Sequence, residues 1–166
     1  MPPPPPPTPQ TGSCLCGLIT YTITPNAPPV YSVLCHCDNC KKATGGHFIC
    51  NTIYQKQHFT LTHGSPKAYR DAATDSGTPL YRHFCGDCGS NLWITTPLVE
   101  GIVSVLTGTL DAGVAREAWR PNKEQYIEAK AHWLPDFDLI EKPGVAMRHE
   151  RGPSLDAFKS SSSSSN

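Results

Sequence analysis

The sequence lacks an excess of charge, a long apolar run and a recognisable leader, and each absence excludes a class of protein. Its 14 basic and 14 acidic residues cancel to a formal net charge of zero. A dominant nucleic-acid or anionic-membrane partner needs a basic surplus, so we expect neither. The longest apolar run, near Ile102–Leu106, is of strand length, whereas a membrane-spanning helix needs roughly 18 apolar residues.

Both ends of the chain are of low complexity. The proline run Pro2–Pro7 predicts an extended, disordered arm over residues 1–10, and the run Ser160–Ser165 predicts a disordered tail over residues 152–166. The arm has neither the basic start nor the apolar helix of a secretory signal. We therefore expect a cytoplasmic protein, with the nucleus as the alternative, in which cysteines stay reduced. One domain of ordinary size remains, over residues 11–151.

This domain predicts an all-β fold with few short helices. Apolar residues alternate with threonine over Ile19–Thr24, as in a half-buried strand. One helix is expected over Asp38–Ala43, capped by Asp38, and Leu110–Ala118 could form a turn or two. Many short strands between Gly- and Pro-rich turns favour a sandwich or open barrel of antiparallel sheets. The further strand candidates are Val30–Leu34, His47–Tyr54, Phe59–Thr62, Lys67–Arg70, Leu80–Phe84, Asn91–Thr95, Ile102–Leu110 and Glu124–Lys130.

Seven of the eight cysteines fall into three short groups. Their C-x-C and C-x-x-C spacings bring sulfurs onto one small cation and are poor spacings for a disulfide framework. Zinc is the ion we favour for such thiolates, with an iron–sulfur cluster and disulfides as the weaker alternatives. We refer to Cys14, Cys16, Cys85 and Cys88 as the outer cysteines, and to Cys35, Cys37 and Cys40 as the middle cysteines.

The number of sulfurs predicts two different sites. A structural zinc takes four ligands, which the outer cysteines can supply. The middle cysteines would hold a second zinc and leave one position open to a substrate. Spacing alone does not exclude an exchange of members between the two sites.

Three thiolates on one zinc ion make a weak Lewis acid. Such a site suits the binding of a thiol and the formation or cleavage of a carbon–sulfur bond. His36, or a distant histidine, could instead close the site and make it structural. As catalytic candidates, His36 and His47 could move protons, since histidine titrates near neutral pH. Cys50 is interpreted as a small core residue and His83 as a structural one.

The segment after the middle cysteines is the candidate for substrate contacts. Lys41 and Lys42 offer positive charge to a carboxylate, and Gly45 and Gly46 permit close approach of the backbone. A thiol that carries carboxylates, such as glutathione, would fit this setting. A solvated turn is the plain alternative.

These motifs, in this order, resemble the glutathione-dependent formaldehyde-activating family, which includes centromere protein V relatives. The resemblance runs from about Gly12 to Leu134. It implies a β-tent fold, a structural zinc on the outer cysteines, a catalytic-type zinc on the middle cysteines, and the joining of formaldehyde to glutathione as S-hydroxymethylglutathione. The matching motifs are Cys14-x-Cys16-Gly17, Cys35-His36-Cys37-x-x-Cys40-Lys41-Lys42 and Phe84-Cys85-x-x-Cys88-Gly89-Ser90.

Three functions follow as hypotheses. The first is a zinc-dependent carbon–sulfur lyase that acts on an adduct of glutathione or a related thiol. The second is a non-catalytic module in which two structural zincs stabilise a protein-binding surface, because one fold hosts many functions. The third is a thiol-dependent isomerase or dehalogenase on the same site. We expect two zinc ions per chain, glutathione as a co-substrate, no nucleic acid and no membrane, and a homodimer is one assembly that the sequence permits.

Overall fold

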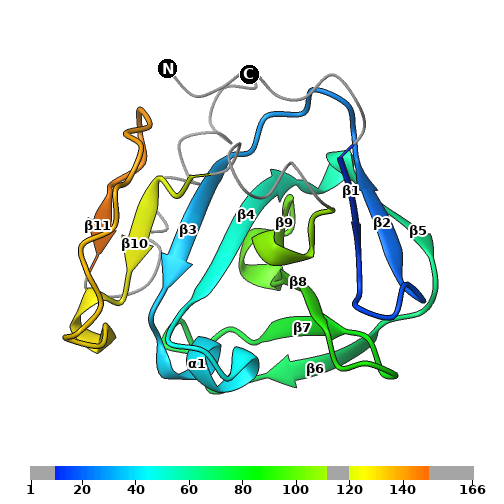
Figure 1. Ribbon diagram of the computed structural model, residues 1–166, viewed down its shortest axis with the longest axis horizontal. Helices are drawn as coiled ribbons and strands as arrows, with labels where there is room; N and C mark the ends of the chain where they lie inside the picture. Colours follow the sequence, from blue (N-terminus) through cyan, green and yellow to red (C-terminus); the bar gives the residue numbers. More distant parts are fainter. Residues whose placement is uncertain (1–9, 112–119, 150–166) are drawn as a thin grey trace.

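Two β-sheets and one short helix form the part of the chain that the computed structural model describes, residues 10–111 and 120–149 (Figure 1). The smaller sheet has the order β1-β2-β5, with β1 at Gln10–Ser13, β2 at Thr20–Ile23 and β5 at Phe59–His63. The larger sheet has the order β11-β10-β3-β4-β9-β8-β7-β6. Its strands are β3 (Tyr31–Cys35), β4 (Ile49–Gln55), β6 (Lys67–Asp71), β7 (Leu80–Phe84), β8 (Asn91–Thr95), β9 (Ile102–Leu106), β10 (Lys123–Gln125) and β11 (Arg148–His149).

Within the described residues, one helix and four 3₁₀ turns lie in the connections between the strands. Helix α1 spans Asp38–Thr44 and joins β3 to β4 at one end of the larger sheet (Figure 1). Single 3₁₀ turns follow β4, precede β9, follow β9 and follow β10. These turns are η1 (Lys56–His58), η2 (Pro97–Val99), η3 (Thr107–Thr109) and η4 (Ile127–Ala129).

An aromatic core lies between the two sheets. Tyr21 and Phe59 of the smaller sheet pack on Trp93 of the larger sheet, with ring centroids 5.8 and 4.8 Å from the indole. Gly12 on β1 lies under the Tyr21 ring, where a Cβ atom would be 2.1 Å from Tyr21 Cζ. Glycine at this position therefore allows the two neighbouring strands to close over the tyrosine.

The two faces of the larger sheet have different partners. Side chains alternate along a strand, and Trp93 on β8 and Val103 and Val105 on β9 enter the aromatic core. On the opposite face, Val33 of β3 and Ile53 of β4 line an open cavity. The cavity that adjoins the middle cysteines is therefore built on the face that the smaller sheet does not cover.

The all-β prediction is confirmed, with α1 close to its predicted bounds. In three predicted strands a limit is displaced by two residues or more. The candidate at His47–Tyr54 begins at Ile49 and runs to Gln55, and the one at Ile102–Leu110 ends at Leu106, where the chain enters η3. The candidate at Glu124–Lys130 is only Lys123–Gln125, because Tyr126 takes a left-handed conformation that ends the strand.

Three further predictions are corrected in detail. Gln10 belongs to β1 rather than to the arm, and its buried Oε1 accepts a hydrogen bond from the Tyr54 hydroxyl at 2.7 Å. Strand β10 pairs in parallel with β3 and β11, so the sheets are not wholly antiparallel. The N-cap of α1 is Cys37, whose sulfur accepts from the Cys40 amide, and not Asp38. Residues 1–9, 112–119 and 150–166 lie outside the described residues. They include most of Leu110–Ala118, the predicted arm except Gln10, and the predicted tail.

Candidate metal centres and the adjoining cavity

The four outer cysteines meet at one point between the sheets. Their sulfur atoms all lie within 4.8 Å of one another. Cys14 Sγ is 3.5 Å from Cys16 Sγ, and Cys16 Sγ is 3.7 Å from Cys85 Sγ. One pair comes from the turn between β1 and β2 and the other from the turn between β7 and β8. The cluster therefore joins the smaller sheet to the larger one.

Each outer pair is shaped by a glycine that follows it. Gly17 has φ of 76° and Gly89 has φ of 74°, a left-handed conformation that costs glycine little. Their amides donate to the carbonyls of Cys14 and Cys85 at 3.0 and 2.9 Å. These turns bend each cysteine pair back on itself and bring its two sulfurs together.

The sulfur geometry fits a zinc tetrahedron. Zinc–thiolate bonds of about 2.3 Å in a tetrahedron place the sulfurs about 3.8 Å apart. The Cys14–Cys16 and Cys16–Cys85 sulfur separations of 3.5 and 3.7 Å are close to that value. The outer cysteines thus form a closed set of four ligands that could hold a metal ion.

The three middle cysteines form a second cluster at the start of α1. Their sulfurs also lie within 4.8 Å of one another. Cys35 ends β3, Cys37 caps α1, and Cys40 lies in its first turn, where its amide donates to Cys37 Sγ at 3.4 Å. Hydrogen bonds from the Cys35 and Cys40 side chains lower the pKa of Cys37. A crowded set of thiols that shares its protons in this way is suited to a cation.

The second cluster offers a metal ion three protein sulfurs rather than four. Within residues 10–111 and 120–149, no histidine nitrogen or carboxylate oxygen joins the three sulfurs. His36, which could have closed the site, is fully buried with its Nε2 atom 2.8 Å from Glu124 Oε1. Its ring contacts Phe48 and Phe137. The structure therefore does not bring His36 to the metal cluster.

The middle cysteines open onto a cavity of about 970 Å³. This volume is within the range of small-molecule sites, roughly 300–1,000 Å³. Apolar side chains of the larger sheet form much of the wall, and polar groups converge near the sulfurs. The lining includes Tyr31, Val33, Ile53, Ile94, Leu80 and Leu98 on the apolar side, and Asn39, Asp75, Arg82, Gln125, Tyr126 and Glu128 among the polar groups.

Arg82 was missed by the sequence analysis and lies beside the middle cysteines. It sits in the middle of β7, is 6% exposed, and has both terminal nitrogens 3.9 Å from Cys40 Sγ. The available signal was a charged residue in the strand Leu80–Phe84. That signal could not be connected with Cys40, which is 42 residues away in the sequence.

Tyr126 is a second residue that the sequence analysis missed. It has φ of 57° and ψ of 49°, a left-handed conformation that costs a bulky residue free energy. Like Cys37, it packs against a buried cluster formed by Cys35, Cys40, Ile49 and Leu106. Burial and the neighbouring Asp75 carboxylate raise the pKa of Tyr126. The fold therefore holds an aromatic hydroxyl against the cysteines and next to an acid from the facing loop.

The residues after the middle cysteines that were predicted to contact a substrate are not among those that line this cavity. Lys41 binds Asp38 Oδ1 at 2.9 Å and the Ala129 carbonyl at 3.1 Å. Lys42, Gly45, Gly46 and His47 are exposed, and His47 stacks edge-on against Trp133 at 4.7 Å. Together with Lys41, they are absent from the described lining of the cavity.

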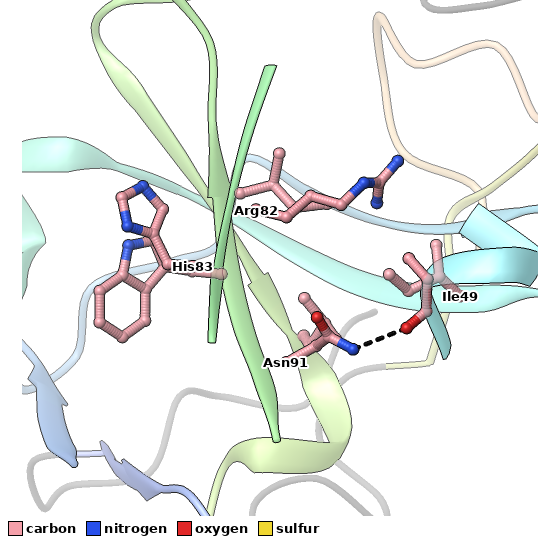
Figure 2. Close-up of a pocket in the computed structure, with 8 residues that line it drawn as sticks. Ile49, Arg82, His83 and Asn91 are labelled. Atoms are coloured by element: carbon pink, nitrogen blue, oxygen red, sulfur yellow. Dashed lines mark hydrogen bonds between the residues drawn. The ribbon is translucent and has the colours of Figure 1, made fainter. Parts of the chain in front are cut away.

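Figure 2 shows the two sides of β7. Arg82 and His83 leave β7 on opposite sides, as alternation requires. His83 stacks on Trp93 at 5.2 Å and contacts Thr95 Oγ1 at 3.0 Å, in agreement with the structural role expected for it. The Asn91 amide, also in this view, donates to the Ala43 carbonyl at 2.8 Å and attaches the end of α1 to β8.

Comparison with known proteins gives one family. The model of the family described as glutathione-dependent formaldehyde-activating enzyme matches residues 9–129. A Halomonas elongata protein whose name carries the same description is 26% identical over 125 residues, which is 74% of this chain and 78% of that protein. The crystal structure of a Rhodobacter sphaeroides protein has 15% identity and a TM-score of 0.49, over 61% of this chain and 88% of the other. Within the described ranges, no helix is long and apolar enough to cross a membrane.

Proposed function

Because the chain belongs to the family of glutathione-dependent formaldehyde-activating enzymes, we propose that it is a zinc-dependent carbon–sulfur lyase of the S-hydroxymethylglutathione synthase type. The observation that carries the proposal is the position of the three middle cysteines in the wall of a cavity large enough for a small peptide thiol. The name of the Halomonas relative agrees with this activity.

The two cysteine clusters have different tasks in this proposal. The outer cysteines would hold a structural zinc, because four protein sulfurs complete its coordination. The middle cysteines would hold a catalytic zinc, because three sulfurs leave a position free. Zinc at that position supplies a cation that stabilises a thiolate at neutral pH. A reducing compartment such as the cytosol would keep all seven sulfurs available.

The proposed reaction forms one carbon–sulfur bond and transfers one proton. In the direction of synthesis, the glutathione thiol gives up its proton and its sulfur bonds to the carbonyl carbon of formaldehyde. The π bond of the carbonyl breaks, and its oxygen takes up one proton, so thiol and aldehyde give the adduct with nothing left over. Cleavage reverses both changes. Tyr126 and Asp75 face the cavity beside the cysteines, so we assign the handling of this proton to them. His36 is buried and His47 lies outside the cavity lining, which leaves them indirect roles.

The cavity walls favour one orientation of the substrate. The polar groups Asn39, Arg82 and Gln125 lie at the cysteine end, and they would contact the peptide groups of glutathione next to its sulfur. The apolar wall of Val33 and Ile53 lies further along the sheet. Burial of the substrate between these walls would exclude water, which strengthens the polar contacts near the sulfur.

The open second cluster also bears on the other two hypotheses. A non-catalytic module needs no vacant ligand position and no cavity beside its metal, so these features favour an enzyme. A thiol-dependent isomerase or dehalogenase would use the same cysteines with another electrophile. Assays of candidate substrates with and without glutathione would distinguish that activity from the lyase.

The test is an exchange measurement by NMR. Isotope-labelled formaldehyde and glutathione reach equilibrium with their adduct, and the exchange rate is measured with and without the zinc-loaded protein. We expect the protein to accelerate exchange, and Cys37→Ser to abolish the acceleration. Cys50→Ser is the matched control, because Cys50 contacts Thr107 and belongs to neither cluster. An unchanged exchange rate with both metal sites loaded would contradict the proposal.

A further inference from the structure

The Arg82 guanidinium lies between Asp71 and Cys40. It donates hydrogen bonds to the Asp71 carboxylate from one edge and faces the Cys40 sulfur with another. Nε and Nη2 donate to Asp71 Oδ2 at 3.0 and 2.8 Å. Nη1 and Nη2 are both 3.9 Å from Cys40 Sγ. Arginine has five N–H donors in a rigid, planar fork and stays protonated in proteins. Cys40 therefore has a permanent positive charge against its sulfur, in an orientation that Asp71 fixes.

Asp71 is itself held in place from α1. The Asn39 side-chain amide donates to both carboxylate oxygens of Asp71, at 3.0 and 3.2 Å, and to the Ala73 carbonyl at 2.8 Å. Asn39 directly precedes Cys40 in the sequence. The contacts thus form a ring that starts on α1, passes through the edge strand β6 and the neighbouring β7, and returns to α1.

The ring is buried. The side chains of Arg82 and Asp71 are 7% and 8% exposed. Burying such a pair costs several kcal/mol per ion, and apolar residues of similar volume often serve stability as well or better. The pair needs a further explanation, and the nearby cluster of three cysteines provides one. Three thiolates around a divalent cation carry a net negative charge, which an adjacent guanidinium offsets.

We propose that Arg82 is a positioning residue of the second metal site: oriented by Asp71 and Asn39, it fixes the Cys40 sulfur and offsets the charge of the thiolates, so that the site retains its metal and accepts an anionic thiol. Partners of metal ligands typically change metal affinity by 10–100-fold when they are removed. The inference uses the metal assignment of the proposed function but does not depend on which reaction follows.

The experiment compares the two metal sites within one chain. The protein is loaded with cadmium, whose NMR signal distinguishes a three-thiolate from a four-thiolate site, and is titrated with a competing chelator. Arg82→Gln is expected to weaken cadmium retention at the middle cysteines by about 10–100-fold, with the outer cysteines unchanged. Arg82→Lys should fall between, because an ammonium keeps the charge but lacks the fork. Arg70→Gln is the matched control, because Arg70 is exposed on β6.

A second measurement is the affinity of the cadmium-loaded protein for glutathione. Arg82→Gln should weaken it, and Asp71→Asn should weaken it less, because Arg82 keeps its charge but loses its orientation. Should Arg82→Gln not fold, the double variant Asp71→Leu with Arg82→Met keeps an apolar filling and is measured in its place. Equal retention at the middle cysteines with and without Arg82, or an equal loss at both sites, would overturn the proposal. Normal metal retention without any lyase activity would refute the proposed function alone.

Discussion

His36 and Glu124 form a hydrogen-bonded pair that is shielded from solvent, with Nε2 and Oε1 2.8 Å apart and exposures of 0% and 1%. His36 stands between Cys35 and Cys37 in the sequence, yet its side chain lies against Glu124 and not among the three sulfurs. Lys130 Nζ is 2.9 Å from the same Glu124 oxygen, and Arg148 Nε is 3.5 Å from the other. This network attaches Lys130 and Arg148, in the C-terminal part of the described chain, to the segment of the middle cysteines through Glu124 and His36.

Glu124→Gln should destabilise the protein by about 3 kcal/mol at pH 7. The reason is that removing one partner leaves the nearly buried Lys130 with only a more distant, exposed carboxylate, Asp136 Oδ1 at 3.7 Å. The free energy of unfolding in urea measures this effect. Glu100→Gln is the control, since Glu100 is exposed in the turn before β9. A loss no larger than that of the control would show that the network does not stabilise the fold.

The effect of Glu124→Gln should depend on pH. Burial alone would raise the pKa of Glu124, but hydrogen bonds and charges from Lys130 and His36 outweigh burial and lower it below its ordinary value of 4.5. A lowered pKa contributes stability above the unfolded value, and that contribution is lost as the pH falls through the folded value. The stability difference between wild type and Glu124→Gln should therefore be constant above about pH 5 and shrink below it. A difference that grows on acidification would contradict this sign.

The two metal sites should differ in their effect on stability. The outer site closes a loop between Cys16 and Cys85 of 69 residues, whereas the middle site closes one of 5 residues between Cys35 and Cys40. Loop-closure entropy favours the longer link by about 2 kcal/mol. Cys88→Ser should thus lower Tm by roughly 4–8 °C more than Cys37→Ser. Calorimetry of the zinc-loaded proteins tests this, and an equal loss would refute it.

Cys50 should behave as a core thiol. Burial raises its pKa, so the unreactive thiol form dominates at neutral pH. Alkylation of Cys50 in the folded protein should be at least about tenfold slower than in urea. Cys50→Ala should keep both metal ions and cost about 1 kcal/mol. Mass spectrometry after timed alkylation measures the rate, and loss of a metal ion from Cys50→Ala would show that Cys50 contributes to a site.

Tyr126 should affect thiol binding more than stability. Tyr126→Gly removes a ring that packs on the middle cysteines, but it also relieves the left-handed strain by about 1–2 kcal/mol. The free energy of unfolding should therefore change less than the 3–5 kcal/mol of an ordinary large-to-small core substitution. Glutathione binding should weaken in Tyr126→Gly and less in Tyr126→Phe, which keeps the ring. Calorimetric titration measures both, and unchanged binding in Tyr126→Gly would exclude Tyr126 from the site.

The cysteine clusters could be predicted because each pair or triplet is local in the sequence. Ligands two or three residues apart must meet on one small cation, whatever the rest of the fold does. The number of cysteines then predicts one cluster of four sulfurs and one of three, and the structure groups them in the same way. The short helix after Cys37 could also be predicted from its local residues.

The cavity residues could not be predicted, because sheet topology decides them. Lys41 and Lys42 were favoured for their nearness in the sequence to Cys40, but the first turns of α1 direct Lys41 to Asp38 and the Ala129 carbonyl. Arg82 reaches the cysteines only because β7 lies across the sheet from β3. Tyr126 does so because β10 pairs in parallel with β3, which places Gln125 beside Cys35. No local pattern encodes either pairing.

The distribution of ligands along the chain has a consequence for the order in which a new chain gains its metal. The three middle cysteines leave the ribosome together, whereas Cys14 and Cys16 must wait for Cys85 and Cys88. Cys40 and Cys85 are 45 residues apart (85 minus 40), a delay of about 2–9 s at ordinary rates of synthesis. Through most of that interval the middle cysteines are complete as a set of possible ligands, but Arg82 and the rest of β7 have not yet been synthesised. The open site can therefore capture a metal ion before the fold that encloses it exists.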